Sequence, residues 1–346
     1  MKYFSLFSGI GGFELGIQQA YEQKNKRLVD KKGQMDTVSG RQETLNSSGM
    51  GNTYAVQSGN ESDKPIPICI GYSEIDKYAI QIYQKHFPNH TNYGDITKIN
   101  ADELPDFDFL CGGFPCQAFS IAGLRRGFED TRGTLFFEIA RILQAKRPSL
   151  LLLENVKGLL SHDKGATFER IIQTLDELGY DLQWQVLNSK NFGVPQNRER
   201  VFIVGHLRGT SRPEVFPFGE SQQKSEGALG LQSIRQIART LRATDYKGTH
   251  NNIGEIVQKN HPKHSNNRVY SEAGISPTLN TAQGGNRQPK VEDEYKIRRL
   301  TPKECERLQG FPDNWTEGIS DTQRYKCLGN AVTVNVIQAI IEKLLK

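Results

Sequence analysis

Residues 107–117 have the sequence Phe107-Asp108-Phe109-Leu110-Cys111-Gly112-Gly113-Phe114-Pro115-Cys116-Gln117. The apolar residues of 107–111 predict a β-strand, and the glycines and proline that follow predict a stiff, exposed turn that carries Cys116. Doubly wound sheets place reactive groups just beyond the carboxyl ends of their strands. A cysteine there can attack carbon once it is a thiolate. A tight turn around a small buried residue explains the same residues equally well, so the flanking sequence has to decide.

Predicted strands and helices alternate on both sides of this turn. The continuous apolar run 149–153 is typical of a parallel strand that is buried on both faces. This alternation predicts an α/β fold with a doubly wound sheet covered by helices. Further strands are predicted at 3–7, 66–73, 183–188 and 200–205, and helices at 13–21, 77–86, 135–145, 167–178, 302–309 and 332–345.

Two stretches interrupt the alternation. From about Lys24 to Lys64 the chain is rich in Lys, Gln, Asn, Ser and Gly with little apolar periodicity, which predicts a long solvated loop. Residues 206–295 lose the strong apolar runs and predict a small, loop-rich lobe that contains β structure. We therefore expect a sheet domain at 1–205 with an insertion at 24–64, a second domain at 206–295, and a segment 296–346 that returns to the sheet domain.

The composition is that of a globular protein. The 346 residues are enough for a large α/β domain and a smaller lobe. The formal net charge of +5 permits a polyanionic partner without requiring one. The five cysteines are odd in number and lack zinc-pair or CxxC spacing, so we expect a reducing cytosol and no metal. We predict no signal peptide, because glycines break the N-terminal apolar run, and no membrane span.

The N-terminal motif Phe7-Ser8-Gly9-Ile10-Gly11-Gly12 lies where a strand turns into a helix. Glycines there allow a nucleotide-like ligand to approach the backbone. Glu74 ends the next strand and is placed for ribose hydroxyls; the alternative is a helix N-cap, for which Asp76 is the better candidate. Asp95 is placed for an adenine amino group. The turn lacks the third spaced glycine of a dinucleotide site, which favours an adenosine cofactor.

The motif Glu154-Asn155-Val156 follows the predicted strand 149–153 and faces the same rim as Cys116. Burial would raise the pKa of the Glu154 carboxyl and let it donate a proton. A capping or ion-paired glutamate is the alternative.

Two arginines, Arg198 and Arg200, lie within Gln196-Asn197-Arg198-Glu199-Arg200. Residues two apart point to the same side of an extended segment. These guanidinium groups are therefore placed to hold carbonyl or phosphate oxygens together, or to pair with acids such as Glu199.

Taken together, these motifs resemble those of the bacterial-type DNA (cytosine-5)-methyltransferases. The resemblance covers nearly all of the chain outside the insertion and the irregular lobe, and six motifs in the family's order make a chance match negligible. It implies an S-adenosylmethionine-dependent methyltransferase fold, a Rossmann-like, mostly parallel sheet, with a target-recognition domain at 206–295. The motifs are Phe4-Ser5-Leu6-Phe7-Ser8-Gly9-Ile10-Gly11-Gly12, Pro115-Cys116-Gln117, Glu154-Asn155-Val156, Gln196-Asn197-Arg198-Glu199-Arg200, Arg299-Leu300-Thr301-Pro302-Lys303-Glu304-Cys305 and Leu328-Gly329-Asn330-Ala331-Val332.

The resemblance implies methyl transfer from S-adenosylmethionine to C5 of a flipped cytosine in a specific duplex DNA site, leaving S-adenosylhomocysteine. Cys116 resembles the nucleophile that adds to C6 and makes C5 electron-rich. Glu154 resembles the acid at N3, and Arg200 the residue that holds O2 with support from Arg198. The residues that resemble the cofactor pocket are Phe7, Gly9, Gly11, Glu74, Ile75, Asp95, Ile96, Pro115, Leu135, Asn330 and Val332.

The segment 118–132 resembles the family's mobile loop that closes over DNA. With Cys116 as the nucleophile, the base must leave the duplex for the chemistry to occur. The residues expected to contact DNA are Gln117, Ser120, Arg125, Arg126 and Arg132 near this loop, and Arg242, Tyr246 and Lys247 in the lobe.

The implied partner is double-stranded DNA, with a cognate restriction endonuclease as a genetic rather than a physical partner. The resemblance implies a monomer of the bacterial cytosol, in a restriction-modification system or as an orphan or phage methylase. One alternative is a tRNA cytosine-5-methyltransferase of the same fold, against which the sizeable lobe argues. The other is a non-catalytic DNA-binding homologue, against which the intact Cys116, Glu154 and Arg200 argue.

Overall fold

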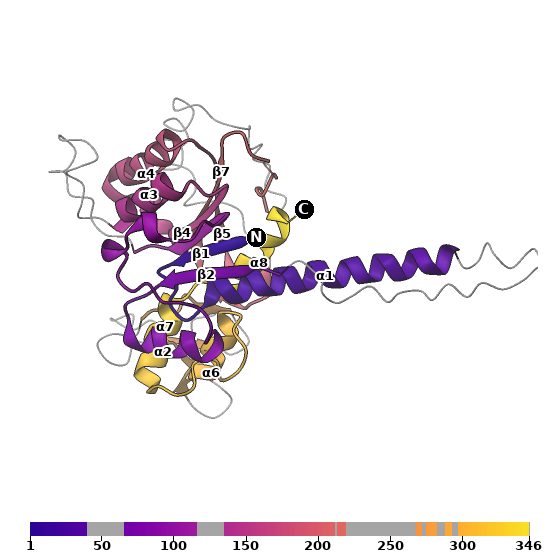
Figure 1. The fold of residues 1–346 in the computed structure, drawn as a ribbon. Coiled ribbons are helices and arrows are strands. Elements are labelled where there is room, and N and C mark those ends of the chain that lie inside the picture. Colours follow the sequence, from indigo (N-terminus) through magenta and orange to yellow (C-terminus); the bar gives the residue numbers. More distant parts are fainter. Residues whose placement is uncertain are drawn as a thin grey trace, which may run out of the picture.

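A six-stranded sheet forms the centre of the computed structural model, which describes residues 1–39, 66–115, 135–211, 213–218, 268–271, 275–281, 288–292 and 297–345. The strands lie in the order β2-β1-β3-β4-β7-β5 (Figure 1). All neighbours pair in parallel except β7, which is antiparallel to β4 and β5, so the predicted mostly parallel sheet is confirmed. The bounds are β1 (Lys2–Leu6), β2 (Ile68–Ser73), β3 (Phe109–Gly113), β4 (Leu150–Val156), β5 (Tyr180–Asn188) and β7 (Glu199–Leu207).

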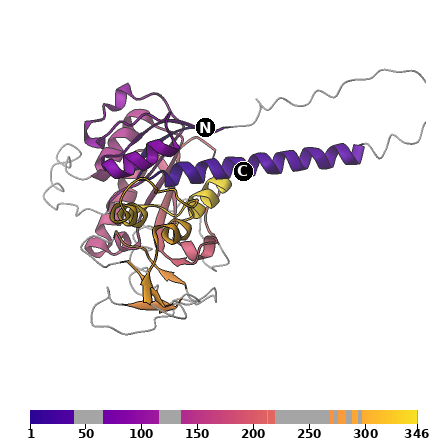
Figure 2. The same cartoon turned by 90° about the horizontal axis from the view of Figure 1, so that it is seen from below.

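Helices cover both faces of this sheet (Figures 1 and 2). Helices α3 (Leu135–Lys146) and α4 (Ala166–Glu177) pack on one face, and α1 (Gly12–Ser39) and α8 (Val334–Leu344) on the other. Successive side chains of a strand point to opposite faces, so each strand supplies both cores. Phe4, Leu110, Leu151 and Ile203 belong to the first core, and Tyr3, Phe109, Leu152 and Val204 to the second. Cys111 is fully buried in the second core.

Helix α1 continues well past its predicted end. The sequence predicts a loop from Lys24, whereas the chain stays helical to Ser39 and projects from the body (Figures 1 and 2). Lys24 Nζ donates to the carbonyl of Leu345 at 2.6 Å, and Arg27 Nη2 lies 3.1 Å from a carboxylate oxygen of Glu342. The prediction failed because it relied on apolar periodicity, which marks only helices with a buried face. Residues 22–28 are mostly polar residues with high helix propensity, and they form a helix without such a pattern. Residues 40–64 of the predicted insertion lie outside the described residues.

Strands β3 and β4 both end later in the sequence than predicted. β3 continues through Gly113, so both glycines lie in the strand rather than in the turn. Gly112 is required there, because a Cβ would lie 2.7 Å from the carbonyl oxygen of Leu6 on the neighbouring strand. β4 likewise continues to Val156, so Glu154 is a strand residue that pairs with Gly113.

The chain after β7 stays with the sheet domain past the predicted boundary at 205. β7 ends at Leu207, and residues 213–218 run beside β5, where Gln183 Oε1 accepts from the backbone N–H of Val215 at 3.0 Å. Lys343 of α8 donates to the carbonyl of Val215 at 2.7 Å.

The C-terminal helices form a third cluster with α2 (Lys77–His86). Helix α6 (Pro302–Leu308) begins with a capping box between Thr301 and Glu304, which satisfies backbone N–H groups at the helix start. Helix α7 (Asp321–Asn330) was not predicted, because its sequence is polar and buries only Cys327, Leu328 and Gly329.

The described part of the lobe contains β structure, as predicted. β10 (Lys290–Glu292) pairs with β8 (Val269–Ser271) and with β11 (Ile297–Arg299) (Figure 2). β9 (Ser276–Pro277) pairs with β6 (Gln196–Asn197), which ties the lobe to the segment before β7. β11 lies beyond the predicted end of the lobe at 295. Single turns of 3-10 helix occur at η2 (Ile96–Lys98), η3 (Ala101–Glu103), η6 (Lys157–Leu160), η7 (His162–Gly165) and η8 (Ser189–Phe192).

Across the ranges that the structure describes, no helix combines the length and apolar character needed to cross a membrane.

Candidate functional site

A pocket of about 320 Å³ opens where β1 to β4 end. Eight of the residues predicted for the site line it: Phe7, Gly9, Glu74, Pro115, Glu154, Arg198, Arg200 and Asn330. Residues that were not predicted to contact a ligand line it as well, chiefly Ile10, Asp76, Gly113, Phe114, Asn155 and Cys327. The structure therefore brings both ends of the chain and the middle strands to one cavity.

The loop after β1 forms one end of the pocket in a backbone conformation that glycine favours. Phe7, Gly9 and Gly11 have φ values of 53°, 56° and 88°, all in the left-handed region. Gly9 N donates to Glu74 Oε2 at 2.9 Å, which joins this loop to the end of β2. The backbone at Gly9 lies at the pocket, and Glu74 Oε2 can accept a further hydrogen bond. This arrangement suits a nucleoside, whose ribose hydroxyls donate hydrogen bonds.

Asp76, and not Glu74, is the N-cap of α2, as the sequence predicted. Its Oδ1 accepts from the backbone N–H groups of Tyr78 and Ala79, at 2.9 and 3.2 Å. Its Oδ2 lies 2.6 Å from Lys326 Nζ of α7. Those hydrogen bonds and the lysine lower the pKa of the Asp76 carboxyl against the opposing effect of burial. The pair fastens α7 to the start of α2 at the wall of the pocket.

Six residues predicted for the cofactor pocket lie outside its lining. Ile75 is 72% exposed beside Glu74, and Asp95 Oδ1 accepts from the backbone and hydroxyl of Thr97. The proposed contact of Ile75 with the cofactor and that of Asp95 with its adenine amino group stay predictions. The other four are Gly11, Ile96, Leu135 and Val332, of which Ile96 belongs to the first core and Val332 to the second.

Glu154 lies at the other end of the pocket and is 9% exposed. Its Oε1 is 3.1 Å from Arg200 Nε. Burial raises the pKa of the carboxyl; the charges of Arg200 and Arg198 oppose this but do not cancel it. Gly113 leaves room for the acid, since a Cβ there would lie 2.9 Å from Oε2. The Glu154 carboxyl thus pairs with Arg200, and its raised pKa also favours the protonated form. Both roles that the sequence left open, the ion-paired glutamate and the proton donor, are therefore compatible with its surroundings.

Arg198 is buried and makes its hydrogen bonds to backbone carbonyls. It donates to Leu279 of the lobe at 3.1 Å, and to Gly329 and Ala331 at 3.0 and 2.8 Å. Both Arg198 and Arg200 line the pocket, as their two-residue spacing predicts. The guanidinium of Arg198 therefore joins the lobe, the end of α7 and the start of β7 behind the pocket wall.

Asn155 is a site residue that sequence reasoning missed. Its Nδ2 donates to the carbonyl of Phe114 at 2.9 Å and holds the turn that leads to Cys116 against β4. Its place beside Glu154 in the quoted motif was the available signal. Outside the described residues lie Cys116, Gln117, Ser120, Arg125, Arg126, Arg132, Arg242, Tyr246 and Lys247.

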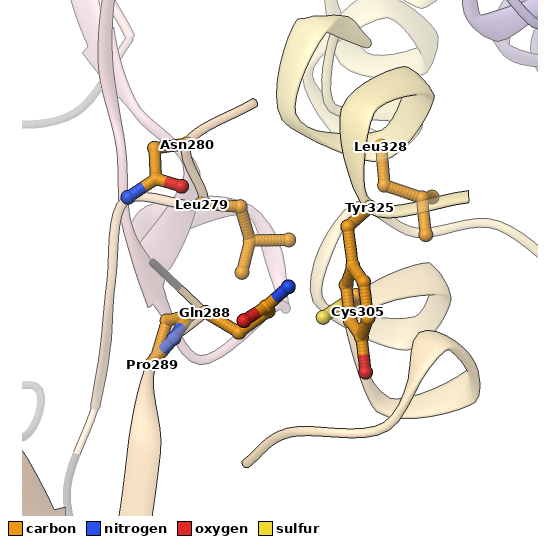
Figure 3. Close-up of a pocket in the computed structure, with 7 residues that line it drawn as sticks. All are labelled: Leu279, Asn280, Gln288, Pro289, Cys305, Tyr325 and Leu328. Atoms are coloured by element: carbon orange, nitrogen blue, oxygen red, sulfur yellow. The ribbon is translucent and has the colours of Figure 1, made fainter. Parts of the chain in front are cut away.

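A much smaller cavity lies where the lobe meets α6 and α7. Figure 3 shows Leu279 and Gln288 facing Cys305 and Tyr325 across this contact. Its volume of about 10 Å³ holds at most about one water molecule, so it is a packing gap rather than a ligand site. Among the residues that the structure describes, no group of three or more His, Cys, Asp or Glu side chains is arranged to hold a metal ion.

Comparison with known proteins identifies a family model and relatives that match most of this chain. The family model described as C-5 cytosine-specific DNA methylase matches residues 56–346. The Type II methyltransferase M1.ScrFI of Lactococcus lactis subsp. cremoris is 42% identical over 288 residues, which cover 79% of this chain and 71% of that protein. The Type II methyltransferase M.NlaX of Neisseria lactamica is 36% identical over 346 residues, with 99% and 96% covered.

Solved structures show the same fold at low sequence identity. A Spodoptera frugiperda DNMT2 mutant superposes with a TM-score of 0.62 at 18% identity, covering 100% of this chain and 99% of that one. The S. pombe Dnmt2 methyltransferase gives a TM-score of 0.61 at 19% identity, with 100% and 98% covered. At such identities the likeness extends to the fold alone.

Proposed function

Because this chain belongs to the C-5 cytosine-specific DNA methylase family, a family of DNA cytosine-C5 methyltransferases, we propose that it works through a covalent bond between Cys116 and C6 of a cytosine flipped out of duplex DNA. The methyl donor in this proposal is S-adenosylmethionine. One observation carries the proposal: the loop after β1, the end of β2 and the buried Glu154 share a single pocket, which is also lined by Pro115, the residue before Cys116 in the sequence.

The pocket fits S-adenosylmethionine by the chemistry of its walls. Phe7, Gly9 and Glu74 would hold the adenosine end, and Asn330 and Pro115 lie on the way to Glu154. The carboxylate of Glu74 adds negative charge, which suits a sulfonium cation, whereas the charge of Asp76 is offset by Lys326. When bound, this cofactor supplies the methyl group that C5 of the cytosine receives.

The residues of the chain prepare the base for that transfer. The Cys116 thiolate forms a bond to C6 while Glu154 gives its proton to N3, so the electron pair of the C5–C6 double bond is available at C5. Arg200 carries a fixed positive charge for O2, where negative charge develops. After methylation a base removes the C5 proton, the thiolate leaves C6, and Glu154 takes back the N3 proton. The raised pKa of Glu154 suits both transfers.

Arg198 acts in this scheme as a positioning residue, since its three carbonyl partners fix the segment that carries Arg200. The lobe within 206–295 is the proposed target-recognition domain, and segment 118–132 the proposed loop that closes over DNA. Double-stranded DNA is the proposed substrate, and a restriction endonuclease the proposed genetic partner.

Methyl transfer to duplex DNA and to tRNA transcripts tests the proposal directly. We expect labelled methyl groups only in DNA, and bisulfite sequencing to place them at one short site. Duplexes that contain 5-fluorocytosine at that site should form a covalent complex with the wild type and none with the Cys116→Ser variant, which should still bind DNA. Activity confined to tRNA, or full turnover by Cys116→Ser, would refute the proposal.

A further inference from the structure

We propose that Trp315 is a positioning residue for the cofactor loop and sets the affinity for the cofactor without touching it; this inference rests on the proposed function. Trp315 lies between α6 and α7, far in sequence from the loop at residues 7–12. Its indole N–H donates to the carbonyl of Ile10 at 2.9 Å, in a buried contact. Ile10 lines the pocket between Gly9 and α2, whereas Trp315 itself does not.

The loop needs support of this kind because its backbone is unusual. Phe7 adopts a φ of 53°, a left-handed conformation that is unfavourable for a residue with a side chain. At Gly11 the loop lies against Phe87 so closely that a Cβ would be 2.5 Å from the ring. Contacts from outside the loop therefore hold it in the shape that forms the pocket. The bond from Trp315 is one of them.

Trp315 is itself fixed from two sides. Its ring stacks on His86 of α2 with centroids 3.6 Å apart and planes 5° from parallel, and His86 Nε2 lies 2.7 Å from the Trp315 carbonyl oxygen. On the other side the buried carboxylate of Glu306 accepts from the backbone N–H groups of Asn314 and Thr316, at 2.7 and 2.9 Å. These contacts fix the indole, which thereby connects the C-terminal helices to the cofactor loop.

Trp315 can change the affinity for the cofactor by changing the fraction of molecules in which the loop at residues 7–12 has the conformation that binds the cofactor, here called the competent loop. Loss of one neutral hydrogen bond shifts the equilibrium between the competent loop and its other conformations about fivefold away from the competent form. The apparent dissociation constant rises in proportion as the competent state becomes rarer. A residue with a purely structural role would instead change stability and leave the cofactor affinity of the folded protein unaltered.

The Trp315→Phe variant tests this, because it keeps an aromatic six-membered ring and removes the N–H donor together with the rest of the five-membered ring. Calorimetry with S-adenosylhomocysteine should show a dissociation constant three- to tenfold above that of the wild type. The KM for S-adenosylmethionine should rise by the same factor, with kcat at saturating cofactor and the KM for DNA within twofold. The matched control is Tyr325→Phe, which removes the hydroxyl donor to the Leu300 carbonyl, away from the pocket. It should leave the cofactor affinity unchanged.

A second measurement uses the intact protein and does not depend on how the variant folds. The chain has two tryptophans, so the indole N–H resonance of Trp315 can be assigned by comparison with Trp184→Phe. Coupling between sites is reciprocal. Exchange of this proton with solvent should therefore slow at least threefold when S-adenosylhomocysteine binds.

An unchanged dissociation constant in Trp315→Phe, an equal rise in Tyr325→Phe, or unaltered indole exchange on binding would each refute the positioning role alone. Failure of the wild type to bind S-adenosylhomocysteine would refute the proposed function, and the positioning role with it.

Discussion

The buried acid Glu14 should make the protein less stable as the pH rises. Glu14 lies on α1 and is 1% exposed, and burial raises the pKa of its carboxyl from 4.5 to about 7. The nearby hydroxyls of Ser5 and Tyr83 oppose this shift. Among the described residues, neither carboxylate oxygen of Glu14 makes a hydrogen bond of good geometry, so these hydroxyls offset the cost of burial only in part. Desolvation therefore dominates, and the neutral acid is the favoured form in the folded chain.

The magnitude follows from the two pKa values. Between pH 4.5 and about 7 the folded state binds a proton that the unfolded state has lost, so folding stability falls as the pH rises. A difference of about 2.5 pH units, at about 1.4 kcal/mol per unit, amounts to about 3 kcal/mol. The stability is fully present below pH 4.5 and lost above pH 7. About 2 to 3 kcal/mol of the change falls between pH 5 and pH 8.

The Glu14→Gln variant removes this titration and keeps the shape of the side chain. Its free energy of unfolding in urea, relative to wild type, should rise by about 2 to 3 kcal/mol between pH 5 and pH 8. The matched control is Glu22→Gln, an exposed residue on the same helix, for which the difference from wild type should stay constant. A constant difference for Glu14→Gln across this range would contradict the argument, because it would mean that the buried carboxyl does not titrate there.

Three further changes have expected outcomes. Glu154→Gln should lower kcat by about 10²- to 10⁴-fold, since it removes the proton donor, while calorimetry shows cofactor affinity within twofold of wild type. Arg198→Lys cannot serve the carbonyls of Leu279, Gly329 and Ala331 together and should lower the free energy of unfolding by about 3 kcal/mol in urea titrations; an unchanged midpoint would show that these bonds are replaced by others. Thr301→Ala removes the capping box of α6 and should cost about 1 kcal/mol by the same measurement.

The central sheet was predictable because buried parallel strands leave a strong signal. The run 149–153 and the acids and glycines at strand ends place β4 and the pocket rim before any coordinates are known. Glu154 and Arg200 share that rim because β4 and β7 are neighbours, so the site follows largely from the fold. The family assignment, which the comparisons confirm, rests on the same motifs.

The missed features share a physical cause. Periodicity detects burial, so it overlooks helices held by polar or sparse contacts, such as the outer part of α1 and the whole of α7. Long-range side-chain contacts leave no sequence pattern at all. The carbonyl partners of Arg198 and the Asn155 bond to Phe114 join segments whose proximity only the folded chain reveals. The end of β3 at Gly113 was not predicted, because glycine usually indicates a turn. Here the lack of a side chain at Gly113 leaves room for the carboxyl of Glu154.

The pocket draws its walls from opposite ends of the chain, and this has a consequence for synthesis on the ribosome. A nascent chain translated as far as Leu308 already holds Phe7, Glu74 and Glu154, yet it lacks the wall that Asn330 provides. The α2 helix then also lacks the partner that Lys326 gives to Asp76. The proposed cofactor pocket is therefore completed only when α7 has emerged and folded back, and a transcript that stops before it yields a protein without a complete pocket.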